Sequence, residues 1–214
     1  MKIANIKVNK LVAELIGTFV LSFVVLASTG GVFGDFISTP ALAGGVLVLL
    51  VMSIGAVSGT HINPAVTAGL LSVKKIELNE AIGYVIVQMI GAAAAIFVLN
   101  GFVDGNVTRV GTEISSSLDV RIMLAELFGT AFFLFGIAAA IHNKLEDFTA
   151  AALIGGSLFL GIIMAAAGGS LGILNPAIAL TLNAFNWTYV IGPILGAILG
   201  ANFYTMLLTE KGKL

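Results

Sequence analysis

Two copies of the tripeptide Asn-Pro-Ala carry the clearest chemistry in this chain; they are Asn63-Pro64-Ala65 and Asn175-Pro176-Ala177. Asparagine is among the best helix N-caps because its side-chain oxygen accepts a backbone N–H, and proline at the first helical position wastes no hydrogen bond. Each motif therefore predicts the start of a helix. With its oxygen engaged, each asparagine can offer its amide N–H₂ to a passing solute. Each helix would also aim its positive dipole end, about half an elementary charge, at that place and repel cations.

The spacing of these motifs indicates an internal duplication. Asn175 lies 112 positions after Asn63, and Glu126 lies 112 positions after Glu14. The two glutamates stand in matching runs, Ala-Glu-Leu-Ile-Gly-Thr and Ala-Glu-Leu-Phe-Gly-Thr. Two different motifs that share one interval predict two related halves, at about 1–105 and 115–214, within a single domain. Function is expected where the halves meet.

Composition predicts a membrane protein. The chain is 58% hydrophobic and 10% charged with a mean hydropathy of +1.09, whereas a soluble domain carries about 25% charged residues. A net charge of −1 gives no general attraction to nucleic acid, so no nucleic-acid partner is expected. The sequence has no cysteine, no metal-ligand cluster and no nucleophile–base pair, so we expect neither an enzyme nor a bound metal or cofactor.

Apolar segments of the right length predict the architecture. A helix needs about 20 apolar residues to cross a bilayer, and six stretches approach that length: 11–29, 41–58, 81–100, 121–141, 148–167 and 188–208. Two shorter stretches, 63–72 and 175–184, follow the Asn-Pro-Ala motifs and reach only about halfway. Three spans per half is an odd number, so the second half must enter the membrane inverted. The predicted fold is an all-α membrane protein with six transmembrane helices plus two re-entrant half-helices in an inverted repeat.

The positions of the basic residues predict a multi-pass protein of the cell membrane with both termini in the cytoplasm. Eight lysines fall in segments that six spans place on one side, and only Arg109 and Arg121 fall on the other. The N-terminal stretch starts basic, like a signal peptide, but no A-x-A cleavage site follows its apolar run. We expect it to remain as the repeat partner of 121–141.

The chain resembles the aquaporin, or major intrinsic protein, family over essentially its whole length. The resemblance rests on 13–19, on Ser-Gly-Thr-His-Ile-Asn-Pro-Ala-Val-Thr at 58–67, on the second Asn-Pro-Ala, and on 190–193 with Gly196 and Ala197. It implies a right-handed bundle, one pore per subunit and a homotetramer in membrane lipid. It also implies that water and small neutral solutes are the partners.

The resemblance assigns roles to three buried polar residues. Glu14 and Glu126 are the only carboxylates well inside the spans. They are expected to accept hydrogen bonds from the two re-entrant loops, as similar glutamates do in the family, while proton coupling is the alternative. His61 is expected on the first loop, facing the cytoplasmic vestibule, where packing is favoured over pH gating.

The sequence departs from the family at the selectivity filter. Aquaporins typically carry arginine directly after the second Asn-Pro-Ala, where this chain has Ile178. Family spacing places the companion positions at Ala43, Ile163 and Gly172. Loss of arginine removes a fixed charge and several donors, and Ala43 in place of an aromatic should widen the opening.

The resulting hypothesis is a passive channel for small uncharged solutes, such as glycerol-like molecules, urea, ammonia or dissolved gases, with water passing as well. Two alternatives stay open. The first is a proton-coupled transporter or a leaky cation channel that uses Glu14 and Glu126. The second is a structural membrane protein with a closed pore, since isoleucines that meet across an apolar pore could exclude water.

Overall fold

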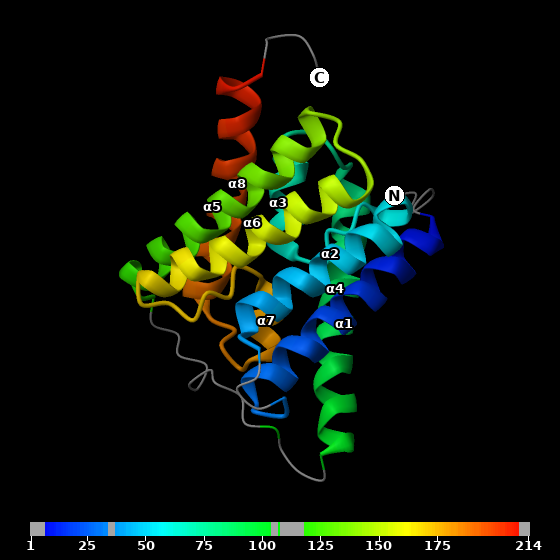
Figure 1. Cartoon of the computed structure of the whole chain (residues 1–214), viewed down its shortest axis with the longest axis vertical. Helices are drawn as coiled ribbons and strands as arrows, with labels where there is room; N and C mark the ends of the chain where they lie inside the picture. The colour runs from blue at the N-terminus through cyan, green and yellow to red at the C-terminus, as the bar shows by residue number, and fades with distance from the viewer. Residues whose placement is uncertain (1–6, 34–36, 104–106, 108–117, 210–214) are drawn as a thin grey trace.

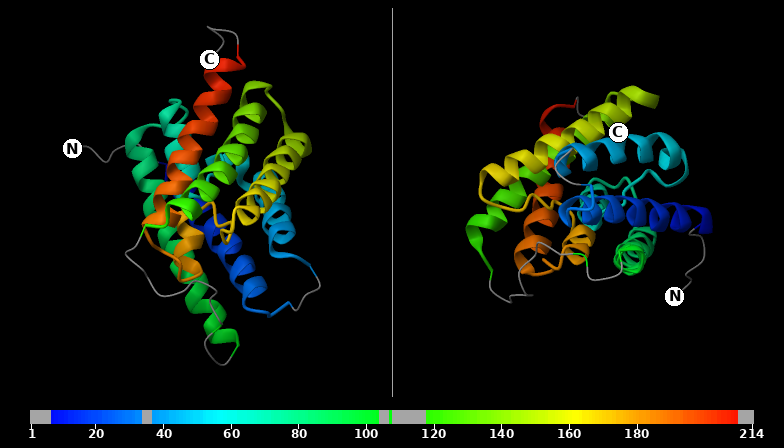
Figure 2. Two further views of the ribbon diagram at one scale, coloured as in Figure 1. Left: turned by 90° about the vertical axis from the view of Figure 1, so that its left-hand side faces the viewer. Right: turned by 60° about the horizontal axis from the view of Figure 1, so that its bottom comes forward.

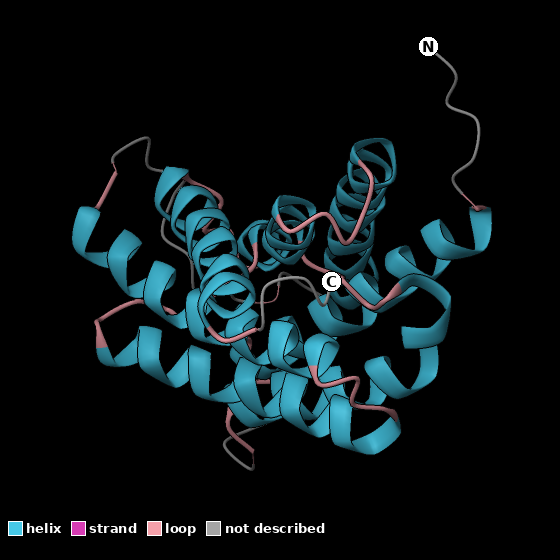
Figure 3. Cartoon of the chain, turned by 90° about the horizontal axis from the view of Figure 1, so that it is seen from above, coloured by secondary structure: helices cyan, strands magenta, loops and turns pink. Residues whose placement is uncertain are grey.

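The computed structural model describes residues 7–33, 37–103, 107 and 118–209, and its described part consists of helices and loops without strands (Figures 1 and 3). The helices are α1 (Val8–Thr29), α2 (Thr39–Ser58), α3 (Pro64–Ser72), α4 (Leu78–Phe102), α5 (Val120–His142), α6 (Asp147–Ala167), α7 (Pro176–Thr181) and α8 (Trp187–Leu207). All but α3 and α7 are long and apolar enough to cross a membrane. The six predicted spans and the two short helices are therefore confirmed. The segment that separates the predicted halves lies largely outside the described residues.

Local sequence explains where several helices begin and end. Asp119 caps α5, its Oδ1 accepting from the N–H of Ile122 at 3.0 Å, and Asn186 caps α8 in the same way. Gly59 ends α2 in the left-handed region at φ +86°, a conformation that glycine adopts without steric cost. That turn directs the chain into the first Asn-Pro-Ala segment.

The two halves of the chain pack in matching ways. Helix α1 packs on α4 in the first half, and α5 packs on α8 in the second, where the two run side by side (Figure 2). Helices α2 and α6 pack against each other across the halves. Each short helix also contacts the last long helix of the opposite half, α3 on α8 and α7 on α4. The two Asn-Pro-Ala segments are thus held inside the bundle by both halves.

Glycines allow α5 and α8 to approach closely. A Cβ on Gly192 would lie 2.7 Å from the carbonyl oxygen of Met123, and one on Gly200 would overlap the carbonyl oxygen of Ala131. Small residues on the contact face of a helix let two helices pack tightly in lipid, where packing drives helix association.

We expect Gly200→Ala to lower the stability of the purified protein by about 1–3 kcal/mol, the usual cost of overpacking. The added methyl group meets backbone of α5, which cannot move aside without shifting the helix. Gly156→Ala on α6 is the matched control, because a Cβ there meets nothing within 4 Å. Thermal unfolding in detergent measures both. Equal melting temperatures for the two variants would contradict the close approach of α5 and α8.

Candidate functional site

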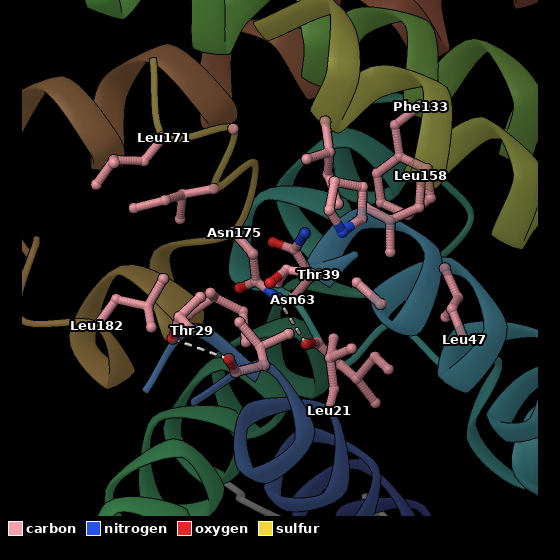
Figure 4. A pocket seen from close by; sticks show the side chains of 18 of the residues that line it. Leu21, Thr29, Thr39, Leu47, Asn63, Phe133, Leu158, Leu171, Asn175 and Leu182 are labelled. Carbon is pink, nitrogen blue, oxygen red and sulfur yellow. Dashed lines mark hydrogen bonds between the residues drawn. The ribbon is translucent and has the colours of Figure 1, made fainter. Parts of the chain in front are cut away.

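Both Asn-Pro-Ala motifs begin helices in the expected manner. The Oδ1 of Asn63 accepts from the N–H of Ala65 at 2.8 Å, where α3 starts. The Oδ1 of Asn175 accepts from the N–H of Ala177 at 2.9 Å, where α7 starts. Both asparagine side chains are buried, and they lie close together at the centre of the bundle (Figure 4).

The amide nitrogens of these asparagines bind the opposite loops. Asn63 Nδ2 donates to the carbonyl oxygen of Leu174 at 2.9 Å, and Asn175 Nδ2 donates to that of Ile62 at 3.1 Å. An amide N–H₂ carries two hydrogens, so one N–H of each asparagine remains for a solute. The sequence led us to expect both hydrogens to be free. The difference arises because each loop carbonyl is buried beside the other motif and needs a donor.

Glu14 braces the first loop. Its carboxylate is fully buried and accepts four hydrogen bonds. The donors are Ser58 Oγ at 2.7 Å, the N–H groups of His61 at 2.9 Å and Ile62 at 2.6 Å, and Gln88 Nε2 at 2.8 Å. The loop leading into Asn63 is therefore held by the carboxylate of Glu14 from α1, and Gln88 of α4 holds that carboxylate in turn.

Glu126 holds the second loop at positions that follow the same repeat interval. Its carboxylate, also fully buried, accepts from the N–H of Ile173 at 2.9 Å, from the N–H of Leu174 at 2.7 Å and from Ser170 Oγ. Each donor lies 112 positions after its counterpart around Glu14. Gln88 is the exception, because its counterpart is Gly200, which packs on α5.

Sequence reasoning missed two serines that complete these braces. Ser58 Oγ accepts from the N–H of Thr60 at 3.1 Å, and Ser170 Oγ accepts from the N–H of Gly172 at 3.2 Å, while each serine also donates to its glutamate. The signal was available, since Ser170 lies 112 positions after Ser58. Tyr84 was also missed; its hydroxyl donates to the carbonyl oxygen of Ser58 at 2.7 Å from α4.

Ser58→Ala and Ser170→Ala are expected to destabilise the protein by about 1–3 kcal/mol each, because each removes the acceptor of a loop N–H and a donor to a buried carboxylate. Ser53→Ala is the matched control, since Ser53 Oγ donates only to carbonyl oxygens of its own helix. Thermal unfolding in detergent measures the stability of the three variants. Re-swelling of proteoliposomes made from the same preparations measures their solute flux. Equal melting temperatures for the three variants would mean that Ser58 and Ser170 do not stabilise the loops.

His61 is a packed side chain beside the site. It is 7% exposed, its Nδ1 lies 3.2 Å from Thr67 Oγ1, and its ring meets that of Tyr84 edge-on with centroids 5.1 Å apart. One nitrogen and one ring face are therefore in contact with protein. These contacts are those of a packed side chain.

A cavity of about 280 Å³ adjoins the asparagines. It is lined by both asparagines, by the predicted filter residues Ala43, Gly172 and Ile178, and by His61. Its remaining wall is almost entirely apolar, with Leu47, Phe133 and Leu158 on one side of the asparagines in Figure 4. None of the described residues that line it carries a carboxylate, ammonium or guanidinium group.

Ile163, which family spacing predicted for the filter, does not line this cavity. Its side chain is 42% exposed, whereas the preceding Ile162 is buried and lines the wall. Successive residues on an α-helix are about 100° apart, so a shift of one position turns a side chain from the cavity to the outer surface. Gly172 approaches Ile162 closely, since a Cβ there would lie 2.7 Å from the Ile162 carbonyl oxygen. Ile162 therefore replaces Ile163, and it lines the cavity from α6 together with Leu158 and Ala166.

The described part of the chain offers no metal centre: no group of three or more His, Cys, Asp or Glu side chains there could hold an ion. The cavity lining offers two asparagine N–H groups, the imidazole of His61, loop backbone and hydrocarbon. Such groups suit passage or binding of a neutral molecule rather than bond making.

Comparisons with known proteins agree with this geometry. The family model for the major intrinsic protein matches residues 6–204. Aquaporin AqpM of Methanothermobacter marburgensis is 32% identical, with 94% of this chain and 98% of AqpM covered. The glycerol uptake facilitator protein-like 6 of Lactiplantibacillus plantarum is 31% identical, with 90% of this chain and 95% of that protein covered.

A structural comparison leads to the same fold. The X-ray structure of the aquaglyceroporin from Plasmodium falciparum superposes with a TM-score of 0.78 at 21% identity, over 94% of this chain and 96% of that one. The members of this family are channels and not enzymes. With a family model that spans almost the whole chain, relatives above 30% identity and the same helical fold, the chain belongs to the major intrinsic protein family.

Proposed function

We propose that this membrane channel conducts small uncharged solutes, and water with them, along a path through the cavity at the two Asn-Pro-Ala motifs. One observation carries the proposal: Asn63, Asn175 and three predicted filter residues from separate segments all line a single cavity. Convergence of residues far apart in the sequence is what a permeation path requires.

Exclusion of cations follows from what surrounds the asparagines. The N-termini of α3 and α7 both meet there, each with a partial positive charge of about half an elementary charge. No carboxylate of the described part lines the cavity to offset them. A hydrated cation would lose its water shell and find no anionic replacement, so we expect it to be rejected.

The filter is proposed to be wide and apolar, formed by Ala43, Ile162, Gly172 and Ile178. A side chain as small as that of Ala43 and a residue without a side chain, Gly172, leave more space there than bulky side chains would. The absence of the family arginine at Ile178 removes the strongest reason for single-file water selectivity.

The alternative of a proton-coupled transporter receives less support. It would use Glu14 and Glu126, yet neither glutamate lines the cavity, and their carboxylates already accept four and three protein hydrogen bonds. A closed structural protein would not need a cavity at both motifs.

Topology and assembly are part of the same proposal: a homotetramer in the cell membrane with both termini in the cytoplasm. Lys10 at the start of α1 forms an ion pair with Glu80 at the start of α4, 2.7 Å apart. The starts of α1 and α4 therefore lie on the same side of the bundle, as the membrane topology predicted from the lysine positions requires. Exposed apolar side chains such as Phe97, 82% exposed, suit contact with lipid or a neighbouring subunit.

Stopped-flow light scattering on proteoliposomes tests the proposal. Vesicles are first shrunk with an impermeant osmolyte and then exposed to inward glycerol and urea gradients. We expect re-swelling well above that of empty liposomes for both solutes. Rapid shrinkage without solute entry would identify a water channel with a narrower filter, and no response above empty liposomes would exclude both.

A further inference from the structure

A row of three polar residues runs along the inner face of α4. Glu80, Tyr84 and Gln88 follow one another at intervals of four positions, so they lie on one side of the helix. The row begins near the first turn of α4, where the side chain of Glu80 is 22% exposed, and it ends at Gln88, which is fully buried. It therefore leads from the end of the bundle to the groups that hold the first loop.

The two inner members of this row contact the first loop and the carboxylate that holds it. The hydroxyl of Tyr84 donates to the carbonyl oxygen of Ser58 at 2.7 Å. Gln88 Nε2 donates to the carboxylate of Glu14 at 2.8 Å and to Thr67 Oγ1 at 3.2 Å. Hydrogen bonds weaken steeply when their distance or angle departs from the optimum. The position of α4 relative to α1 therefore decides how well these contacts hold the loop.

The outer member of the row connects α4 to α1. Lys10 Nζ lies 2.7 Å from Glu80 Oε1, and the two residues form the one ion pair within the described part of the chain. Lys10 stands four positions before Glu14, so both lie on the same face of α1. The pairs Lys10–Glu80 and Glu14–Gln88 thus join the same two helices at two different heights. Two such connections restrict both the sliding and the rotation of α4 on α1.

The second half of the chain positions its helices differently. The places that follow the row by 112 positions are occupied by Gly192, Gly196 and Gly200 of α8. A Cβ on any of them would come within 2.7 Å of a backbone oxygen of α5, so direct backbone contact sets the position of α8. The counterpart of Lys10 is Ile122, which carries no charge. The ion pair is therefore particular to the half that holds the first loop.

We infer that Lys10 and Glu80 are positioning residues of the channel. Their ion pair fixes α4 on α1, and Tyr84 and Gln88 of the same row then place the first loop, from which Asn63 lines the cavity. Neither Lys10 nor Glu80 lines the cavity, so the pair acts on a solute only through these other residues. The inference rests on the proposed permeation path and adds a pair near the bundle surface on which that path depends.

Charge reversal tests the pair. Lys10→Glu and Glu80→Lys each place two like charges together, whereas the double variant restores opposite charges. We expect the glycerol permeability of proteoliposomes to fall by about two- to fivefold in each single variant, the effect of one partly exposed ion pair, and to recover in the double variant. The matched controls are Lys7→Glu and Glu77→Lys, which change exposed residues three positions earlier on the same two helices and should keep the wild-type rate.

Amide hydrogen exchange separates local positioning from general stability. The N–H groups of His61 and Ile62 donate to Glu14, and we expect their exchange to become about two- to fivefold faster in each single variant. The N–H groups of Ile173 and Leu174 on the second loop should exchange at the wild-type rate. Equal acceleration in both loops would mean that the ion pair only stabilises the whole protein, and it would overturn the inference.

The outcomes also separate this inference from the proposed function. If the wild type conducts glycerol and the single variants conduct it equally well, or if a folded double variant does not recover, the positioning role is wrong and the channel proposal stands. Lys10→Met and Glu80→Gln remove the pair without placing like charges together, and they replace the reversals if those do not fold; a fall of about twofold is then expected. If the wild type conducts no faster than empty liposomes, the proposed path fails and the inference fails with it.

Discussion

Glu14→Leu is expected to abolish solute flux and to remove most of the stability of the folded protein. The substitution deprives four buried donors of their acceptor: Ser58 Oγ, two loop N–H groups and Gln88 Nε2. An unpaired buried donor costs about 1–3 kcal/mol, and the whole stability of a domain is only about 5–15 kcal/mol. The loop that positions Asn63 would therefore lose its structure.

A matched control and a second variant make this result interpretable. Glu146→Leu changes an exposed glutamate that makes no capping hydrogen bond at the start of α6, and it should leave flux and melting temperature near wild type. Glu14→Gln keeps the shape of the side chain but places an N–H₂ group next to the N–H and O–H donors that Glu14 accepts from. If Glu14 holds the loop, this variant should therefore have a lower melting temperature at every pH. Thermal unfolding in detergent measures all three. A folded, stable Glu14→Gln protein that has lost only a pH-driven component of uptake would support the transporter.

Ile178→Arg is expected to reduce glycerol and urea flux by about tenfold or more. Ile178 is 5% exposed and lines the cavity of about 280 Å³, so a guanidinium group on a long side chain would occupy much of that space. Its charge and five donors would hold water in place of hydrocarbon. Water flux should fall less than solute flux, because water fits beside the new side chain.

The control for this variant is an uncharged side chain of about the wild-type volume at the same position. Ile178→Met is close in volume to the wild type and is expected to retain most of the flux, because volume-conserving apolar exchanges are tolerated best. Stopped-flow re-swelling of matched proteoliposomes compares the two. Unchanged solute flux in Ile178→Arg, with the protein folded, would mean that solutes do not pass this position.

The architecture could be predicted from the sequence because the bilayer sets the length of each span and the local chemistry of Asn-Pro sets the two helix starts. The repeat interval then placed Glu14 and Glu126 in equivalent positions, and both accept hydrogen bonds from the loops as expected. Ser170, which lies 112 positions after Ser58, could have been found from the same interval. Here the internal symmetry was a better guide than the family spacing.

Other features needed the tertiary structure. From α4, Gln88 donates to Glu14 and Tyr84 donates to the carbonyl oxygen of Ser58, and no local sequence pattern specifies where α4 lies relative to the first loop. The prediction of Ile163 as the filter residue on α6 was off by one position for a related reason. Because successive residues of α6 are about 100° apart, an error of one residue moves the side chain from the cavity wall to the outer surface.

Passive passage of neutral solutes and exclusion of protons can be measured in the same vesicles. Proteoliposomes are loaded with a pH-sensitive dye, a potassium diffusion potential is imposed with valinomycin, and solute re-swelling is followed by light scattering in parallel. We predict solute entry that rises linearly with the gradient, without saturation, while proton entry stays at the level of empty liposomes. Voltage-driven proton entry above that level, or solute uptake that saturates and follows the proton gradient, would rule out a passive channel that excludes protons.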